Sequence, residues 1–321
     1  MIGRRALLGL IGIASILSIT RVSAQPRRPF RIVGLMLVQQ ARMQALWRQA
    51  IEKYGYVVGE TIVAESNYGT PEELPALARE LVRTKPDVVV ASSSAALRAL
   101  MSATRAIPVV AIDMETDPVA AGFANSLARP GGNMTGVFLD LPEFSGKRLE
   151  LLKETLPSVT HVVALWDPAM DRTPLKELIR SADILRVRLT VVEMPNEASI
   201  NEATRVAVAG RAGAVMVMRS PRLDELSAQI VKHAGEARLP VFGLFANVPG
   251  AGGLLSFGPN VEELNARTAW YVDRILKGVP PGDLPIRRPE RFDVVVNLKA
   301  AKALGIRVPA SVLVRANDVI S

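Results

Sequence analysis

The chain has 321 residues, of which 49% are hydrophobic and 22% are charged, a composition that excludes an intrinsically disordered protein and allows a sizeable core. It contains no cysteine, which excludes disulfides, thiolate catalysis and zinc–sulfur sites. The formal net charge of +8 is spread along the chain with no block of six like charges, a pattern that suits solubility better than nucleic-acid binding.

The N-terminal segment has the three parts of an export signal. Arg4 and Arg5 form a basic start, "ALLGLIGIASILSIT" an apolar centre, and "VSA" before Gln25 supplies the small residues that a signal peptidase recognises. The apolar run is too short for a comfortable membrane span. We therefore expect residues 1–24 to be cleaved near Ala24, by either the general or the twin-arginine route, leaving a soluble periplasmic protein without a lipid anchor.

After this segment, short runs rich in Val and Ile alternate with amphipathic segments. Most of these runs are continuously apolar, as strands covered on both faces are. The expected strands are 31–38, 61–68, 87–92, 107–113, 134–140, 161–167, 189–195, 213–220, 239–245, 253–258 and 292–298. The first helical segment places one apolar stripe at Met43, Leu46, Trp47, Ala50 and Ile51. The regular alternation predicts an α/β fold with doubly wound parallel sheets and right-handed crossovers.

A single sheet rarely holds eleven strands, and the strand–helix series restarts after residue 140. We therefore expect two lobes, one near 30–140 and one near 141–256. The helix at 271–278 and the strand at 292–298 remain and could serve either lobe, which favours a hinge that the chain crosses several times.

Common catalytic and cofactor motifs are absent from the sequence. There is no G-x-G-x-x-G after a strand, no complete Walker loop and no G-x-S-x-G elbow. The two histidines, His161 and His233, do not form a metal-binding spacing, and we expect each at a surface or sheet-edge position. We expect no cofactor and no metal. A Ser–His–Asp arrangement stays open, although no pattern nominates one.

Polar residues recur where the expected strands end. In open α/β sheets, ligands bind beyond the carboxyl ends of the strands. The candidate ligand-binding residues at these ends are Gln39, Ser93, Ser94, Asp117, Trp166, Asp167, Ser220 and Asn247.

Two of these candidates have specific expected roles. Ser94 is an expected N-cap, whose hydroxyl and neighbouring free N–H groups could hold a ligand carboxylate. Asp117 precedes Pro118 and is expected to start a helix that "RPGG" at 129–132 ends. Its carboxylate could accept a ligand ammonium. For both residues, capping alone remains the alternative. Likewise, Trp166 could stack on a ligand or fill the core, and Asp167 could simply start a turn.

Three long segments resemble the ABC-transporter substrate-binding proteins of the tryptophan-binding-like group. They are "IPVVAIDMETDPVAAGFANSLARPGGNMTGVFLDLPEFSGKRLELLKETLP", "GAGGLLSFGPNVEELNARTAWYVDRILKGVPPGDLPIRRPERFDVVVNLKAAKALGI" and "VPASVLVRANDVI". The resemblance implies the type I periplasmic-binding fold, in which two doubly wound parallel-sheet lobes are joined by a three-crossing hinge. Lobe 1 would comprise 30–140 plus 257–290, and lobe 2 would comprise 141–256 plus 291–321.

The resemblance also implies a function. Such a protein captures a small molecule between its lobes and delivers it to an ABC permease in the inner membrane. It acts as a monomer, not as an enzyme, and binds no nucleic acid. Ser94, Asp117 and Ser220 match polar positions of the family, whereas "VQQARMQ" after the first strand departs from the longer loop often found in relatives. We expect an amino acid or a similar small carboxylate as the ligand.

Three alternatives belong to other classes. An exported α/β enzyme would use one of the histidines, and a binding component could feed a membrane sensor instead of a permease. A ligand-sensing domain of a transcription regulator would need an N-terminal DNA-binding helix pair, but the expected export signal occupies that place.

Overall fold

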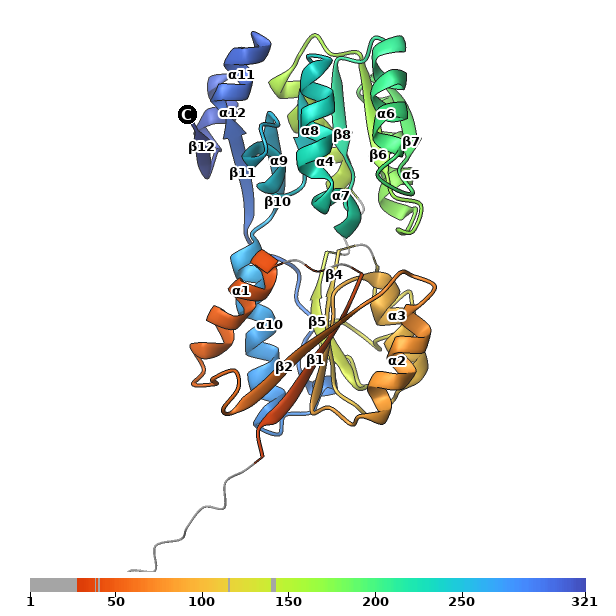
Figure 1. The fold of residues 1–321 in the computed structure, drawn as a ribbon, viewed down its shortest axis with the longest axis vertical. Helices are drawn as coiled ribbons and strands as arrows, with labels where there is room; N and C mark the ends of the chain where they lie inside the picture. Colours follow the sequence, from red (N-terminus) through yellow and green to blue (C-terminus); the bar gives the residue numbers. More distant parts are fainter. Residues whose placement is uncertain (1–27, 38, 40, 115, 140–142) are drawn as a thin grey trace, which may run out of the picture.

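The protein consists of two α/β lobes placed end to end along its long axis (Figure 1). The computed structural model describes residues 28–37, 39, 41–114, 116–139 and 143–321. The expected export signal at 1–24 lies outside the described residues. Among the helices of the described part, none has the length and apolar character needed to cross a membrane.

Lobe 1 is built on a five-stranded sheet of order β2-β1-β3-β4-β5, in which every neighbouring pair is parallel. Its strands are β1 (Phe30–Met36), β2 (Ile62–Tyr68), β3 (Val88–Ala91), β4 (Val109–Asp113) and β5 (Met134–Phe138). Alternate residues of β3 enter two different core clusters, Val88 and Val90 on one face and Val89 and Ala91 on the other. This division explains why the strand sequence is apolar throughout.

The helices of lobe 1 cover both faces of its sheet. They are α1 (Ala41–Glu52), α2 (Leu74–Arg83), α3 (Ser94–Ala103), α10 (Val261–Leu276) and the 3₁₀ turn η1 (Pro281–Asp283). Residues of α2 and α3 pack on the face of Val89, and residues of α1 and α10 pack on the face of Val90. The chain therefore returns to lobe 1 to supply one covering helix.

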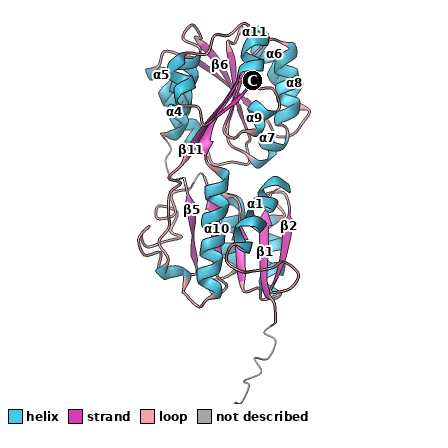
Figure 2. Ribbon diagram, turned by 90° about the vertical axis from the view of Figure 1, so that its left-hand side faces the viewer, coloured by secondary structure: helices cyan, strands magenta, loops and turns pink. Residues whose placement is uncertain are grey.

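Lobe 2 is built on a seven-stranded sheet of order β12-β11-β10-β9-β8-β6-β7. Its strands are β6 (His161–Trp166), β7 (Arg188–Glu193), β8 (Ala214–Val217), β9 (Val241–Gly243), β10 (Leu255–Pro259), β11 (Phe292–Asn297) and β12 (Asp318–Ile320). Only the β10–β11 pair is antiparallel among the described pairs. The reason is topological, since β10 runs toward the hinge and β11 runs back from it (Figure 1; β11 is also labelled in Figure 2).

The helices of lobe 2 are α4 (Phe144–Thr155), α5 (Thr173–Ile184), α6 (Ser199–Ala209), α7 (Pro221–Glu225), α8 (Ser227–Glu236), α9 (Asn247–Gly250), α11 (Leu298–Leu304) and α12 (Ala310–Val314). Residues of α4, α5 and α12 pack on one face of the sheet, and residues of α6, α8 and α9 on the other. The two-layer covering predicted from the apolar strands is thus present in both lobes.

The chain crosses between the lobes three times, after β5, after β10 and before β11. β10 extends to Pro259, so the return to lobe 1 lies after this residue rather than after residue 256. Three phenylalanines, one beside each crossing, pack together. The ring centroid of Phe144 lies 5.0 Å from those of Phe257 and Phe292, which are 6.1 Å apart. All three belong to elements of lobe 2, and they pack on the core cluster of lobe 1 that contains residues of α1 and α10, which connects the two lobes at the hinge.

Candidate functional site

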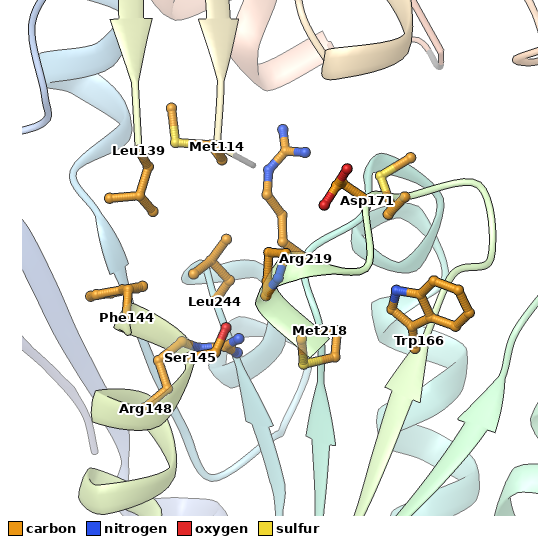
Figure 3. Close-up of a pocket in the computed structure, with 12 residues that line it drawn as sticks. Met114, Leu139, Phe144, Ser145, Arg148, Trp166, Asp171, Met218, Arg219 and Leu244 are labelled. Atoms are coloured by element: carbon orange, nitrogen blue, oxygen red, sulfur yellow. The ribbon is translucent and has the colours of Figure 1, made fainter. Parts of the chain in front are cut away.

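A cavity lies between the lobes, and its empty space, including the part open to solvent, is about 550 Å³. Lobe 1 contributes Met114 and Leu139, and lobe 2 contributes residues that include Trp166, Met218 and Arg219. Figure 3 shows these side chains converging from strands of opposite lobes, with the guanidinium of Arg219 extending from lobe 2 toward lobe 1.

Strand topology explains why these residues meet. Met114 and Leu139 directly follow β4 and β5, and Met218 and Arg219 follow β8, while Trp166 is the last residue of β6. All of these positions are at the carboxyl ends of parallel strands, which face the hinge in both lobes (Figure 1). The geometry agrees with the general placement of ligand sites in open α/β sheets.

Arg148 lies at the lobe 2 side of the cavity and is 5% exposed. Its Nη2 donates to the main-chain oxygen of Val217 at 2.8 Å, and its Nε is buried with no hydrogen-bond partner among the described residues. Burial lowers the pKa of Arg148 to about 10, against the opposing effect of the charge on Asp224. A guanidinium with this pKa remains charged at neutral pH, so the cavity has a fixed cation near its floor.

A polar cluster supports this cation. Burial raises the pKa of Asp224 to about 6, although the charges of Arg219 and Arg148 and a hydrogen bond from Asn247 oppose the shift. The Nδ2 of Asn247 also donates to the main-chain oxygen of Asp224 at 2.9 Å and to Oγ of Ser227 at 3.2 Å. Lobe 2 therefore presents two arginines and one partly buried acid beneath the cavity.

The aromatic wall of the cavity is Trp166, which is 4% exposed and packs in the lobe 2 core. The guanidinium carbon of Arg172 lies 5.0 Å from its ring centroid. The core role and the cavity-lining role that the sequence left as alternatives thus occur together at this residue.

Asp167 and Ser220 are neighbours, each at most 1% exposed. Oγ of Ser220 donates to Oδ2 of Asp167 at 2.6 Å, and Oδ1 of Asp167 accepts from the main-chain N–H of Ala169 at 3.0 Å. Oγ of Ser220 also accepts from the N–H of Arg222 at 3.1 Å, which makes it the N-cap of α7. These contacts give both predicted residues a structural role behind the cavity.

The expected N-cap at Ser94 is shifted by one residue. Oγ of Ser93 accepts from the N–H of Ala96 at 3.1 Å, so Ser93 is the N-cap of α3 and Ser94 is its first helical residue. The backbone of Ser93 is extended, as an N-cap requires, with φ of 172° and ψ of 164°. Oγ of Ser94 accepts from Nη2 of Arg98 at 3.2 Å.

The helix expected after Asp117 is only a turn at 118–122, so this prediction was wrong. Oδ1 of Asp117 accepts from the N–H groups of Val119 and Ala120 at 2.9 and 3.0 Å, as a capping carboxylate does. Gly122 then adopts φ of +73°, which ends the turn before a second turn can form. Asp117 itself is exposed at the edge of lobe 1.

The two remaining candidates differ in their surroundings. Gln39 is exposed in the connection between β1 and α1. Asn247 begins α9 and is held by the contacts with Asp224 and Ser227 described above. Of the eight candidate residues, Trp166 alone is among the described residues that line the cavity between the lobes.

The histidines lie away from the cavity. His161 begins β6 at the opposite end of the sheet, and His233 is on α8. His161 is 4% exposed, which corrects the expected surface or edge position. Its Nδ1 lies 2.9 Å from the oxygen of Gly210 and its Nε2 lies 2.9 Å from Oγ1 of Thr190. Burial lowers the pKa of His161, which favours its neutral form in this network.

Sequence reasoning missed several cavity-lining residues. Arg148 interrupts the apolar stripe of a helix that is otherwise buried at Leu149, Leu151 and Leu152, and this interruption was the available signal. Met218 belongs to the core of lobe 2 and also lines the cavity. No sequence pattern distinguishes Met114 or Leu139 from ordinary core residues.

Comparisons with known proteins agree on one family. A family profile described as ABC transporter substrate binding protein matches residues 46–320. A "Tyrosine-binding protein" of Clostridioides difficile is 26% identical over 267 residues, which cover 81% of this chain and 75% of that protein.

Two solved structures are similar over the whole length of their own chains. A conserved domain protein from Vibrio cholerae has a TM-score of 0.82 at 28% identity, and the match covers 91% of this chain and 100% of that one. An ABC domain from Streptococcus pneumoniae in complex with L-Trp has a TM-score of 0.80 at 25% identity, with the same coverage of 91% and 100%.

Proposed function

The chain belongs to the family of ABC transporter substrate-binding proteins, and from this premise we propose that its ligand is an amino acid or a similar small carboxylate. The cavity between the lobes carries this proposal, because arginine side chains reach it from one lobe and apolar side chains surround it. The relatives named above, one tyrosine-binding and one in complex with L-Trp, support the same ligand class.

The ligand carboxylate would bind on the lobe 2 side, where Arg148 and Arg219 line the cavity. A charge-assisted hydrogen bond to guanidinium is among the stronger polar contacts available to a carboxylate. Trp166, Met218 and Leu244 would provide the apolar surface for the rest of the ligand. For the ligand ammonium we propose Asp117, which is exposed on lobe 1, and as the alternative Asp171, which lines the cavity from lobe 2.

Binding in such a site is coupled to closure. A ligand held by one lobe gains further contacts when the other lobe folds over it, so the closed form is favoured only when the site is occupied. We propose that this closed form delivers the ligand to an ABC importer in the inner membrane. The export signal at 1–24 would place the mature, monomeric protein in the periplasm, and N-terminal sequencing of the exported protein should then begin at Gln25.

A thermal-shift screen of amino acids and small carboxylates tests the ligand class, because a ligand that binds only the folded state raises its melting temperature. For the best ligand, Arg219→Ala should weaken binding by about 2 kcal/mol, measured by isothermal titration calorimetry. Arg205→Ala is the matched control, since Arg205 pairs with Glu202 on an exposed helix surface. No stabilising compound in the screen, or equal loss in both variants, would overturn the proposal.

The same titrations decide between the acidic residues. Asp117→Ala should weaken the binding of an amino acid but leave the affinity for the corresponding carboxylic acid without an amino group nearly unchanged. If Asp171→Ala has this effect instead, the ammonium is bound from lobe 2.

A further inference from the structure

A second cavity lies inside lobe 1, between α1 and the face of the sheet that α10 also covers. Its empty space, including the part open to solvent, is about 1020 Å³, compared with about 550 Å³ between the lobes. The two cavities share no lining residue among those described. The lobe 1 cavity is therefore a separate feature of the molecule.

The sheet forms the floor of this cavity and α1 forms its roof. The side chains on these two surfaces are too small or too loosely packed to fill the space between them. Gly34, Ala64 and Ser66 line it from the central part of β1 and β2, where larger side chains would occupy the space. The roof is α1, whose residues Ala50 and Ile51 are buried. On the same apolar stripe, Met43, Leu46 and Trp47 are only half-buried.

This arrangement leaves apolar surface incompletely covered. The floor also includes Ile32, Val90 and Ile112 from three strands, and the roof includes Met43 and Trp47. Covering such surface with another apolar group releases water and stabilises the folded state. The physical chemistry of the cavity thus favours an apolar occupant.

The charges around the cavity select a neutral occupant. Arg48 and Glu65 are the charged residues of its described lining, and both are exposed and opposite in sign. Glu65 is also 3.2 Å from the guanidinium of Arg31. An ionised molecule would therefore lose its hydration without gaining a buried counter-charge, in contrast to the arginines between the lobes.

The side chains of the lining favour an aromatic molecule with an acceptor oxygen. Trp47 and Tyr68 provide aromatic surface, and Met36 and Met43 provide flexible thioethers that adapt to a ring. The hydroxyl of Tyr68 accepts a hydrogen bond from Nε2 of Gln44. Nε1 of Trp47, in contrast, is buried without a hydrogen-bond partner among the described residues, so an oxygen of the ligand would satisfy this donor.

We propose that lobe 1 binds a neutral, phenol-sized aromatic molecule beneath α1, independently of the ligand held between the lobes. This site needs no closure of the lobes, because all of its lining residues belong to β1–β4, α1 and α10 of lobe 1 or adjoin these elements.

Calorimetric titration of the mature protein with 4-methylphenol tests the proposal. Wild type should bind it saturably, and more tightly than toluene, which has the same ring without the oxygen. Ala64→Leu should reduce the affinity at least tenfold by filling the floor. Trp47→Phe should bind 4-methylphenol and toluene with similar affinity, because the indole donor is lost.

Two controls keep the result specific. Val63→Leu enlarges a residue of β2 that does not line the cavity and should leave binding unchanged. Arg219→Ala should also leave it unchanged, which separates this site from the one between the lobes. Circular dichroism melting curves verify that each variant folds. If Ala64→Leu does not fold, the affinities of Trp47→Phe for 4-methylphenol and for toluene still test the proposal.

The proposal is wrong if wild type shows no saturable heat up to the solubility limit of 4-methylphenol. It is also wrong if binding survives in Ala64→Leu and disappears in Arg219→Ala, since the probe would then occupy the cavity between the lobes. Because the amino-acid screen uses other probes, and Arg219→Ala should weaken only the binding of the amino acid, the failure of either proposal leaves the other standing.

Discussion

Asp167 and Ser220 illustrate how a polar residue at a strand end can serve the scaffold beside a site. The Asp167 carboxylate is almost fully buried, and its charge is compensated by Ser220, by the N–H of Ala169 and by Arg222, whose Nη1 is 3.4 Å from Oδ1. A buried carboxylate without such partners would be strongly unfavourable. The pair therefore holds together the segments that follow β6 and β8, next to Trp166 and Arg219 of the cavity lining.

Ser220→Ala should lower the free energy of unfolding by about 1 to 2 kcal/mol, because it removes both the N-cap of α7 and the hydrogen bond to Asp167. Urea denaturation followed by circular dichroism measures this change. Ser102→Ala is the matched control. Ser102 is exposed on α3 and bonds only within its helix, so its loss should cost less than about 0.5 kcal/mol. Equal effects of the two substitutions would contradict the structural role of Ser220.

Asp224 makes stability depend on pH in a direction opposite to most carboxylates. Its pKa in the folded protein is about 6, above the value of about 3.9 expected for an unfolded chain. The ionisable groups that act on it are Arg219 and Arg148, which lower the pKa, and Glu225, which raises it. Between these two pKa values the folded state binds more protons than the unfolded state, so stability falls as pH rises.

Asp224→Asn should remove this dependence. We consider the difference in free energy of unfolding between wild type and the variant. This difference should fall by an amount on the order of 2 kcal/mol between pH 4 and pH 7 and stay constant above pH 7. Urea titrations of both proteins at several pH values give this difference, in which the contributions of the other carboxylates cancel. A difference that rises with pH would show that the arginines dominate over burial at this residue.

At the scale of elements, the pairing of β4 with β5 depends on one glycine. Gly136 is in the middle of β5 and has φ of +151°, and a Cβ added to it would lie 2.1 Å from the main-chain oxygen of Ala111 on β4. Backbone atoms of a central strand cannot move to relieve such a contact. The two strands that bring Met114 and Leu139 to the cavity therefore require glycine here.

Gly136→Ala should destabilise the protein by more than about 3 kcal/mol, visible as a large fall in the melting temperature or as failure to fold. Gly235→Ala is its counterpart in α8. A Cβ there meets nothing within 4 Å, so alanine should raise stability by roughly 0.5 to 1 kcal/mol through better helix propensity. Thermal melts of the two variants should move in opposite directions, and a stable Gly136→Ala protein would refute the argument.

At the scale of the whole molecule, the lobes are joined by three crossings and by the cluster of Phe144, Phe257 and Phe292. The cavity that receives side chains from both lobes lies next to this cluster, since Phe144 belongs to both. If the lobes rotate about this aromatic cluster, the opening of the cleft away from the hinge changes its width, while the contacts among the three phenylalanines are kept.

Saturation with the amino acid found in the screen should reduce the radius of gyration measured by small-angle X-ray scattering, because the open form closes on its ligand. Arg219→Ala at the same ligand concentration should show a smaller change, in proportion to its lower occupancy. By contrast, 4-methylphenol should leave the radius of gyration unchanged, because its proposed site lies within one lobe. An unchanged radius with the bound amino acid would contradict closure.

Periodicity and turn chemistry were sufficient to predict the strands and the two-lobe α/β architecture, because a strand buried on both faces must be apolar throughout. Local signals failed where one residue decides the outcome. The one-residue shift of the cap from Ser94 to Ser93 and the turn at 118–122 in place of a helix are of this kind. The hydroxyl groups of neighbouring serines are equivalent in sequence, and only the path of the chain selects one.

The sequence by itself determined the fold class and the family, because each of these depends on patterns repeated over many residues. Tertiary structure alone decided which side chains meet at the site. Arg148 and Met218 join Met114 from the other lobe at the hinge, while Asp167 and Ser220 turn to each other. Tertiary structure also determined the cavity beneath α1, because the volume of a cavity depends on many side chains from segments far apart in the chain.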